Sequence, residues 1–461
     1  MPKFKTIPFA TQEGNAGITQ NSAETLVNMF AEISPGRSNI VRRQRPCLRQ
    51  ILAWSFPGEN RAIERHKGVH YIVRGNIFCS FDGTTVTGLA FLPTFSGRCT
   101  MIFNDNDEIM IADGIYGYKW QLPSGPLTTV TTDPAMNVGT LAYLGGYGVA
   151  NDAGSGRFYS TPANDFSDFD ALDFATAEAN PDPLYRVFAD HNELLLAGER
   201  TIEVWQLSGQ ADFPFQAVPT AKIERGILGP YTLASVADTF AWLGDDRIVY
   251  RGDGYRANRI STHAIETLVN GATDQQLEAA YAMGYTIAGH TFYTLTCPGV
   301  FTAQYNFTTG LWNQANTYGS DSWDVIGSNG KVADYYLTAT GICELTFDVN
   351  QDESRTVVRT ARSAPGDAEG ALITMHEFHA DCEVGRAPLG VTPEIMLRVA
   401  RDGETFGNVR TVSLGTTGNY QTRPVWRGLG QGRKPVLELS ASGNFRFVIT
   451  DPKLNASVGN S

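Results

Sequence analysis

Short runs in which apolar and polar residues alternate recur along most of the chain. Leu194–Ala197, Thr201–Leu207, Thr239–Leu243 and Arg247–Arg251 alternate β-branched or aromatic residues with polar ones, and Gly, Asp and Pro clusters separate these runs. A period of two with turn residues between the runs is typical of consecutive antiparallel strands. Glu224–Gly244 contains too many glycines and turn residues to form one long helix. The pattern therefore predicts an all-β fold.

The layout of strands and turns itself repeats. His70–Ala90 reads as strand, glycine turn, strand, Asp-Gly turn and strand, and Asn106–Val130 repeats that order. Further units follow at intervals of about 45 residues, which is the spacing of four-stranded propeller blades. About six or seven such units fit before residue 360. We therefore predict a β-propeller of six or seven blades over residues 61–362.

One segment between the predicted blades has a helical pattern. Thr273–Gln276 fits a capping box, in which the Thr and Gln side chains satisfy opposite backbone amides. Leu277, Ala280 and Tyr281 then form an apolar stripe that stops near Gly284. Together with His263–Val269 these residues predict a short helical insertion near 263–284.

Two further parts flank the predicted propeller. Residues 1–60 form a polar arm that contains several Gly and Pro residues and one apolar cluster, Leu26–Phe30. Residues 362–370 have the composition of a linker, and 363–461 read as strands of a smaller β-sandwich-like platform domain. In the predicted strand Asn444–Thr450, period two places Phe445, Phe447 and Ile449 on one face. We expect the arm and the C-terminal domain to form a docking platform together.

Composition narrows the class of protein. The chain has 461 residues, a hydrophobic share of 42%, 47 glycines and a formal net charge of −12. Such a chain can bury a large core and is not mainly disordered. Its acidity argues against a surface that binds nucleic acid by neutralising phosphates. The basic cluster of the arm, Arg42, Arg43, Arg45 and Arg49, could contact nucleic acid, although acidic partner surfaces or solvent are more usual for such a cluster.

The sequence contains no pattern typical of a signal peptide, a membrane-spanning helix or a pair of redox-active cysteines. The N-terminal residues contain no apolar region typical of a secretory signal, and no apolar run reaches the ~20 residues of a membrane-spanning helix. The six cysteines are scattered without a Cys-x-x-Cys pair, which indicates synthesis in a reducing cytoplasm.

No group of residues in the sequence has the spacing that would predict a catalytic, cofactor-binding or metal-binding site. Asp165, Asp168, Asp170 and Asp173 could ligate Ca²⁺, but their spacing lacks the calcium-loop pattern and phenylalanines interrupt it. If His376 and His379 lie on one strand, they point to opposite faces and cannot share an ion. Nucleophile elbows, zinc-binding His pairs and phosphate loops do not occur. We therefore predict no enzyme activity and no bound cofactor or metal.

Several segments, taken in order, carry a resemblance to a known family. Thr201–Gly209 (TIEVWQLSG) followed by Lys222–Gly244 resembles the central signature of the packaged-DNA stabilisation proteins of short-tailed bacteriophages, also called tail nozzle or tail hub proteins. Glu24–Glu32 (ETLVNMFAE) is similar to that family's opening segment, Phe158–Leu184 to the blade before the signature, and Arg423–Asp451 to its closing strands. The resemblance spans most of the chain.

The resemblance implies a structural virion protein without catalysis. Members would form a ring, expected to be a hexamer, below the portal and adaptor proteins of the head-to-tail connector. That ring would close the head, retain the packaged DNA and form the DNA exit channel, with a plug or needle sealing its far end. Tail fibres or tailspikes would be further partners, and double-stranded DNA would pass through the lumen without specific binding. The expected location is the virion tail, after assembly in the host bacterial cytoplasm.

Two surfaces are candidates for contact with partners. The arm residues Val27, Asn28, Met29 and Phe30 lie in the motif Glu24–Glu32, and Trp426 with Arg427 lies in a glycine-rich turn. An acidic lumen, which would let DNA slide, is a further hypothesis. The alternative function is a propeller that binds or cleaves surface polysaccharide, as a receptor-binding tail component. That alternative requires aromatic platforms with nearby carboxylates on one propeller face.

Overall fold

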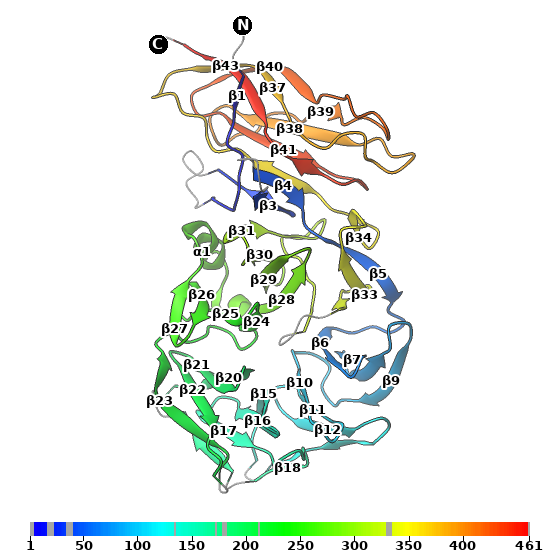
Figure 1. Cartoon of the computed structure of the whole chain (residues 1–461), viewed down its shortest axis with the longest axis vertical. Helices are drawn as coiled ribbons and strands as arrows, with labels where there is room; N and C mark the ends of the chain where they lie inside the picture. The colour runs from blue at the N-terminus through cyan, green and yellow to red at the C-terminus, as the bar shows by residue number, and fades with distance from the viewer. Residues whose placement is uncertain are drawn as a thin grey trace.

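The computed structural model describes residues 4–15, 23–33, 40–132, 135–170, 173–177, 182–210, 213–328 and 334–459. The chain forms two parts that lie end to end, with a ring of blades below and a sandwich of two sheets above (Figure 1). Segments from the N-terminal arm lie between them. The predicted all-β architecture, a propeller followed by a β-sandwich, is confirmed.

Within the described residues, five blades of the ring are four-stranded antiparallel sheets, and a sixth contributes four antiparallel strands to a larger sheet. The strands of the first three blades are β6 (Asn60–His66), β7 (Val69–Arg74), β8 (Ile77–Phe81) and β9 (Val86–Phe91); β10 (Thr100–Phe103), β11 (Glu108–Ala112), β12 (Gly117–Gln121) and β13 (Leu127–Thr129); and β15 (Val138–Leu144), β16 (Tyr147–Asp152), β17 (Arg157–Ser160) and β19 (Phe174–Thr176). Two short strands, β14 (Thr131–Thr132) and β18 (Asp168–Phe169), pair in parallel beside the third blade.

The next three blades continue the same plan. Their strands are β20 (Leu184–Asp190), β21 (Glu193–Gly198), β22 (Ile202–Leu207) and β23 (Phe215–Ile223); β24 (Ala234–Val236), β25 (Thr239–Leu243), β26 (Val249–Asp253) and β27 (Arg256–Arg259); and β28 (Tyr281–Ile287), β29 (His290–Cys297), β30 (Phe301–Asn306) and β31 (Leu311–Gln314). The first strand of each blade faces the centre of the ring, and the fourth lies at its rim (Figure 1).

Burial within a blade explains the sequence pattern. The second strands β7, β11 and β21 are almost entirely buried, because neighbouring blades cover both of their faces. These strands therefore read as nearly continuous apolar runs, as in IMIA of β11 and LLLA of β21. The outer strand β9 contains only half-buried and exposed residues because solvent reaches it.

Strands from both ends of the propeller sequence form the seventh blade of the described ring. Its sheet contains β32 (Tyr336–Leu337), β33 (Gly341–Thr346) and the arm strand β5 (Cys47–Ala53), with Ile326 bridged to Leu337 on the inner side. Strand β5 pairs antiparallel with β33 over the whole length of β33, from Gly341 to Thr346. The strand nearest the N-terminus of the propeller thus closes the ring against the last one.

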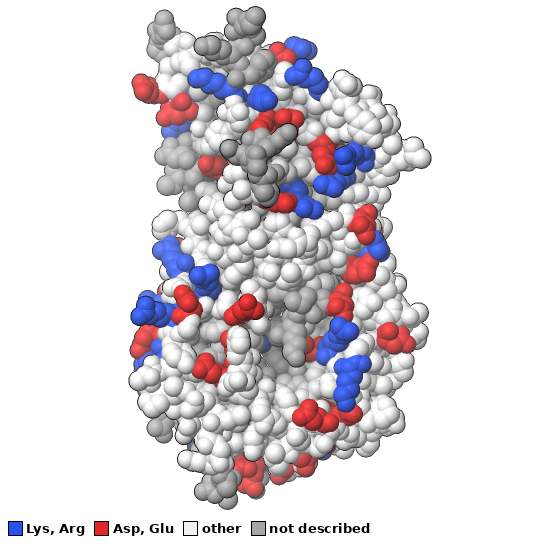
Figure 2. All heavy atoms as spheres, in the orientation of Figure 1, with Lys and Arg blue, Asp and Glu red and all other residues white. Residues whose placement is uncertain are grey.

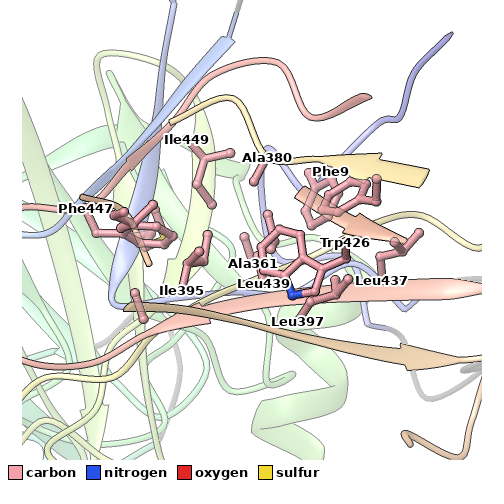
Figure 3. Packing of buried hydrophobic residues seen from close by; sticks show 14 of the residues in the cluster. Phe9, Ala361, Ala380, Ile395, Leu397, Trp426, Leu437, Leu439, Phe447 and Ile449 are labelled. Carbon is pink, nitrogen blue, oxygen red and sulfur yellow. The ribbon is translucent and has the colours of Figure 1, made fainter. Parts of the chain in front are cut away.

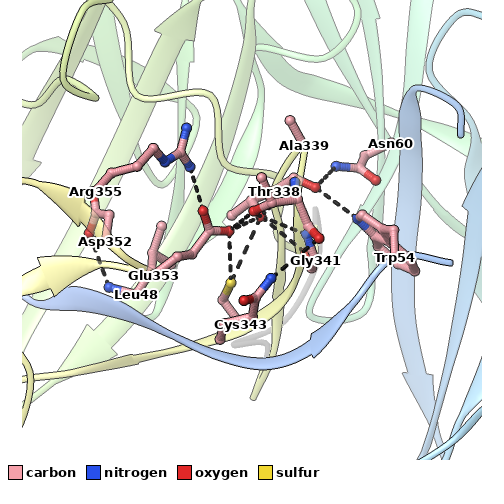
Figure 4. Close-up of polar contacts among 12 residues, drawn as sticks. Leu48, Trp54, Asn60, Thr338, Ala339, Gly341, Cys343, Asp352, Glu353 and Arg355 are labelled. Atoms are coloured by element: carbon pink, nitrogen blue, oxygen red, sulfur yellow. Dashed lines mark hydrogen bonds and ion pairs between the residues drawn. The ribbon is translucent and has the colours of Figure 1, made fainter.

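Polar contacts reinforce this closure (Figure 4). The indole of Trp54 and the amide of Asn60 both donate to the carbonyl oxygen of Thr338, at 2.9 and 2.7 Å. The carboxylate of Glu353 accepts from the hydroxyl of Thr338 and pairs with Arg355 at 2.7 Å. Glu353 precedes β35 (Arg355–Thr356), which forms a hairpin with β34 (Gln351–Asp352) beside β5.

The helical insertion lies between the fifth and sixth blades. It consists of α1 (His263–Asn270) and α2 (Asp274–Glu278), and the capping box of Thr273 and Gln276 is present. The helix ends earlier than the apolar stripe suggested, since Tyr281 already begins β28. Leu277 and Ala280 are buried against the fifth and sixth blades, and so the stripe is a packing face inside the chain.

The C-terminal domain is a sandwich of two sheets. One contains β1 (Phe4–Thr6), β43 (Lys453–Val458), β37 (Ile373–His379) and β40 (Val425–Gly432); the other contains β36 (Arg359–Arg362), β41 (Val436–Ala441), β38 (Glu394–Ala400) and β39 (Arg410–Ser413). Residues from both sheets, among them Trp426, Leu397 and Leu439, share one core (Figure 3). Phe445, Phe447 and Ile449 all point into this core, as the period of two predicted.

The remaining strands belong to the arm. They are β2 (Leu26–Val27), β3 (Met29–Ile33) and β4 (Ile40–Gln44), and β4 pairs with β42 (Val448–Ile449) from the C-terminal domain. Residues 1–60 are therefore divided between the parts: β1 belongs to the sandwich, β5 to the propeller, and β2 to β4 lie between them.

Candidate assembly site at the junction of propeller and sandwich

One continuous sheet crosses the junction between the two parts. Strand β2 pairs in parallel with β31, the outer strand of the sixth blade, and antiparallel with β36 of the sandwich. Among the described strands this gives a nine-stranded sheet, from β28 in the propeller to β39 in the sandwich. Backbone hydrogen bonds flank this pairing on both sides: the N–H of Asn28 donates to the carbonyl oxygen of Gln314 at 2.9 Å, and the N–H of Arg362 donates to the carbonyl oxygen of Thr25 at 2.9 Å.

The arm side chains divide between two hydrophobic cores. Leu26 and Met29 pack in the core of the sandwich. Phe30 instead packs in a propeller core with Phe292 and Trp323. Its ring meets the rings of His290 and Phe292 edge-on, with centroids 5.0 and 5.3 Å apart. Burial on both sides of one strand makes the arm a shared part of the two cores.

Asn28 makes this division possible. Its backbone has φ = 56°, a left-handed conformation that Asn tolerates better than most residues. Its side-chain amide donates to Asn316 and to the carbonyl oxygen of Val358, at 2.6 and 2.8 Å. Its side-chain oxygen accepts from Arg45 Nε at 2.8 Å and from the backbone N–H of Asn316 at 2.9 Å. Asn28 thus turns the chain from β2 into β3 while its polar groups stay satisfied.

Arg45 and Asp352 form an ion pair at the centre of this network. Their side chains are each 1% exposed, and Arg45 Nη2 lies 2.6 Å from Asp352 Oδ2. The remaining N–H groups of Arg45 donate to Asn28, to Asp352 Oδ1 and to the carbonyl oxygens of Pro46 and Asn316. Burial opposes the charge on Arg45, but Asp352 outweighs that effect and raises the pKa of the guanidinium. A buried pair with complete hydrogen bonding defines one geometry for the junction.

The other arm arginines are also engaged within the chain. Arg42 donates to the carbonyl oxygens of Phe9 and Ala10, at 2.7 and 2.6 Å. Burial lowers the pKa of Arg42 to about 10. Arg43 pairs with Glu32 at 3.0 Å, and Arg49 pairs with Glu344 at 2.7 Å. The basic cluster seen in the sequence therefore holds the arm against its own chain.

The structure places the arm candidates inside the junction. Val27 is half-buried, whereas Asn28, Met29 and Phe30 are buried against the chain itself. These residues join propeller to sandwich; their contact with another chain stays a prediction.

The predicted glycine-rich turn at Trp426 and Arg427 is wrong, because both residues lie on strand β40 and pair with β37. The two side chains differ from each other. Trp426 is buried in the sandwich core, and its indole donates to the carbonyl oxygen of Arg410 at 2.8 Å. The side chain of Arg427 is 75% exposed and pairs with Glu377 at 3.2 Å. Of the two, Arg427 has the accessibility that a partner requires.

Sequence reasoning missed Asp352, Asn316 and Arg359. Arg359 is fully buried and donates to Gln44 and to the carbonyl oxygens of Gly443 and Phe445. Asp352 lies 307 positions from Arg45 and Asn316 lies 288 from Asn28, so no local motif could join them. One feature of the sequence could have indicated this buried polar network: the arm contains many arginines but few other charged residues.

Charge is unevenly distributed along the chain. Residues 61–362 contain 19 Lys and Arg against 34 Asp and Glu, whereas the rest contain 17 against 14. The acidic character therefore belongs to the propeller segment. On the face shown in Figure 2, charges of both signs are scattered and large areas carry none.

In the part of the chain that the structure describes, His, Cys, Asp and Glu side chains do not gather in groups of three that could hold a metal ion. None of the helices described above is long and apolar enough to cross a membrane.

Family comparisons account for both parts of the architecture. Residues 12–346 match the family described as the bacteriophage P22 Gp10 β-propeller, and residues 365–457 match the bacteriophage P22 Gp10 β-sandwich. The chain belongs to the bacteriophage P22 Gp10 family. It is also 21% identical over 417 residues to the tail hub protein gp10 of Salmonella phage P22, covering 82% of this chain and 86% of that protein. The family makes it a structural protein of a phage tail.

Solved structures match the chain at low similarity. The computationally designed Ika8 protein is 9% identical, with a TM-score of 0.41 over 65% of this chain and 100% of its own. YCF48 bound to D1 peptide is 12% identical, with a TM-score of 0.41 over 66% of this chain and 98% of its own. Since both scores lie below 0.5, the propeller assignment in the Gp10 family member rests on the family match and on its own sheets.

Proposed function

We propose that this chain forms a closed ring of identical copies, six by the family resemblance, below the portal and adaptor proteins of a short-tailed phage. The ring closes the head, retains the packaged DNA and extends the exit channel. The observation that carries this proposal is the junction, where a nine-stranded sheet and a buried ion pair make propeller and sandwich one body. Membership of the P22 Gp10 family supports the location in the tail.

The mechanical argument concerns force transmission. Packaged DNA presses outward on whatever closes the head, and a wall built from two loosely linked domains would bend at the linker. In this chain, backbone pairing through β2 continues from the sixth blade into the sandwich. Load on one part therefore passes to the other through hydrogen bonds and two shared cores rather than through a flexible linker. Heterologous contacts between identical rigid bodies close a ring when their rotation closes.

The charge argument concerns the lumen. An acidic wall repels the phosphate backbone, so DNA is not trapped while it passes. The excess of Asp and Glu in residues 61–362 supports a propeller surface along the lumen. We propose that the exposed Arg427 on the sandwich contacts the adaptor. The plug or needle and the tail fibres or tailspikes remain further proposed partners, and assembly takes place in the host cytoplasm.

Imaging of the assembled tail tests this proposal. Cryo-electron microscopy of virions, reconstructed without imposed rotational symmetry, is expected to show a closed ring of this chain next to the adaptor. The relative orientation of propeller and sandwich should match the arrangement described here. A chain attached singly at the periphery of the tail, or one that leaves the exit channel unlined, would contradict the proposal.

A further inference from the structure

The two sheets of the sandwich meet at an edge that is closed by side chains. Within the described strands, β40 ends one sheet and β39 ends the other. The indole of Trp426 donates to the carbonyl oxygen of Arg410, and Arg410 Nη2 donates to the carbonyl oxygen of Arg427, both at 2.8 Å. Edge strands carry unpaired backbone groups, and so this edge of the sandwich is open to contact with another chain.

A groove with a volume of about 640 Å³ lies at this edge. Its apolar lining residues are Leu397, Val399 and Leu429, which are buried or half-buried and form its floor. Arg401 and Arg410 also line the groove, and both are exposed. A ligand in this one groove can therefore cover an apolar floor and meet two guanidinium groups.

Arg401 lies directly on the glycine-rich backbone of β40. A Cβ atom placed on Gly430 would lie 2.8 Å from Cζ of Arg401, and one placed on Gly432 would overlap the carbonyl oxygen of Arg401. The two glycines therefore permit this close approach. Within the described residues, the guanidinium of Arg401 forms no hydrogen bond or ion pair. All five of its N–H groups are thus available to a ligand.

Arg410 keeps donors for a ligand although it already bonds the edge of β40. Its Nη2 and Nη1 atoms donate to the carbonyl oxygens of Arg427 and Gly428, at 2.8 and 3.4 Å. A guanidinium has five N–H groups, so these two bonds leave three. Because Arg410 occupies both carbonyl oxygens, a partner strand cannot pair with them. A partner therefore binds here through its side chains.

The positions of the two guanidinium groups indicate which ligand fits them. Arg410 bonds the carbonyl oxygen of Gly428, whereas Arg401 lies over Gly430, two positions further along β40. Two residues of chain span at most about 7 Å. In an extended segment, side chains at alternate positions point to the same side at this spacing. Carboxylates at alternate positions of such a segment would therefore each meet one arginine.

One carboxylate of the chain itself also lines the groove, that of Asp402. Its Oδ1 atom accepts from the backbone N–H groups of Glu404 and Thr405, at 2.9 and 2.7 Å. These bonds close the turn after β38 and lower the pKa of the Asp402 carboxyl. Asp402 therefore weakens the positive charge of the two arginines that line the groove, but one negative charge does not cancel two positive ones.

We propose that the groove between β39 and β40 binds an extended acidic segment of another virion protein, whose carboxylates pair with Arg401 and Arg410. Pairs of arginine and carboxylate are charge-assisted and often bidentate, which gives the contact a defined geometry. The methylene groups of glutamate side chains would cover the apolar floor. Double-stranded DNA is disfavoured, because a phosphate backbone would leave that floor uncovered.

Only the identity of the partner as a virion protein rests on the proposed function. The acidic chemistry of the ligand follows from the groove itself, so a peptide assay with the purified chain tests it separately. Loss of peptide binding would refute the groove while a ring in the virion stays possible. Peptide binding without a ring in the virion would instead refute the proposed function alone.

Fluorescence anisotropy with the full-length chain measures binding. The probe is a labelled peptide, Gly-Ser-Glu-Ser-Glu-Ser-Glu-Gly, and its control has Gln in place of each Glu. At about 50 mM NaCl, where screening is weak, we expect saturable binding of the Glu peptide, at least about tenfold tighter than that of the Gln peptide. Arg401→Gln and Arg410→Gln should each weaken it about tenfold, the loss of one charge-assisted contact. Arg256→Gln, at an exposed position on β27, is the matched control and should bind like the wild type.

Asp402→Asn should change the affinity in the opposite direction. Asn keeps a side-chain oxygen that can accept from Glu404 and Thr405, but it lacks the negative charge that repels the ligand. We expect the Glu peptide to bind this variant about threefold more tightly than the wild type. An unchanged or weaker affinity would contradict a ligand that binds through its carboxylates.

Equal affinities of the wild type for the two peptides, or wild-type binding by Arg401→Gln, would overturn the proposal. Should Arg410→Gln fail to fold, Arg401→Gln and Asp402→Asn still decide, because the guanidinium of Arg401 has no bond to lose within the described residues and Asn preserves the turn. A short DNA duplex that displaces the peptide at micromolar concentration would show that the groove takes phosphates, which would also overturn the assignment to an acidic segment.

Discussion

At the scale of single residues, the fold depends on a few polar groups buried where propeller meets sandwich. Asn28 adopts a left-handed backbone conformation, and its side-chain amide donates hydrogen bonds. Arg45 and Asp352 form a buried ion pair. Such a pair adds little net stability compared with apolar residues of the same shape, but the loss of one partner is costly. Its contribution is therefore to define a single arrangement.

Asp352→Ala leaves the charge of Arg45 buried without its counter-ion. We expect the free energy of unfolding to fall by about 3–5 kcal/mol, measured by urea denaturation. Asp348→Ala is the matched control, since Asp348 pairs with Arg49 at 3.0 Å but is 77% exposed. That control should cost about 1 kcal/mol or less. Similar losses for the two variants would contradict the role given to the buried pair.

Glu13 makes the stability of the arm depend on pH. It is 1% exposed, its backbone N–H donates to the carbonyl oxygen of Trp312 in the sixth blade at 2.7 Å, and burial raises the pKa of its carboxyl above 4.5. The folded chain thus binds this proton more tightly than the unfolded chain. The contribution of Glu13 is full below pH 4.5 and decreases as the pH rises through the folded-state pKa.

Glu13→Gln removes that titration without removing the side chain. We expect the variant to be more stable than the wild type at pH 7, and the difference to shrink towards pH 4.5. Urea denaturation at several pH values measures both effects. The exposed Asp321→Asn is the control for the loss of one negative charge. A difference that is independent of pH would show that the pKa of Glu13 does not change on folding.

At the scale of elements, the two-residue strand β2 connects the two parts of the chain. It joins the sixth blade to the sandwich, and Leu26 within it is fully buried in the sandwich core. Strand β5 closes the seventh blade from the same arm. The arm is therefore structural material of both domains.

Leu26→Asp should uncouple the two parts. The charge in the core opposes docking of β2 by about 3 kcal/mol or more. Scanning calorimetry should show one cooperative transition for the wild type and two separate transitions for the variant. Val458→Asp, at an exposed end of β43, is the control and should keep one transition. A single transition in Leu26→Asp would mean that β2 does not couple the domains.

Many of the strands and helices, and the faces that they bury, could be predicted from the sequence. Alternation in residues such as Phe445, Phe447 and Ile449 predicted the sandwich face, and the capping box at Thr273 predicted α2. The path of the arm could not be predicted, because the partners of Leu26 and Val27 are distant strands. The apolar cluster Leu26–Phe30 predicts that these residues are buried. It does not show that Met29 and Phe30 pack in different cores.

At the scale of the whole molecule, the charge of the propeller segment and the shared sheet of the two parts fit the proposed role as a wall along which DNA passes. Residues 61–362 carry the net negative charge, and the junction makes the two parts one body. Phosphate contacts by Lys and Arg dominate the affinity of proteins for DNA, and an acidic surface works against them.

The purified chain should accordingly fail to bind double-stranded DNA. We expect no retardation in gel-shift assays at 150 mM NaCl with micromolar protein, a regime in which nonspecific binders with basic surfaces do bind. Retardation that weakens steeply with salt would reveal a basic DNA-binding face and contradict the proposed lumen.

Retention of DNA in heads tests the central claim most directly. Phage particles assembled without this protein, and the same particles after addition of the purified chain, are scored for full and empty heads by electron microscopy. We predict that heads package and then lose their DNA without the chain, and that addition before leakage restores full, infectious particles. Heads that stay full without the chain, and particles that fail only to adsorb to host polysaccharide, would contradict head closure and favour a receptor-binding role.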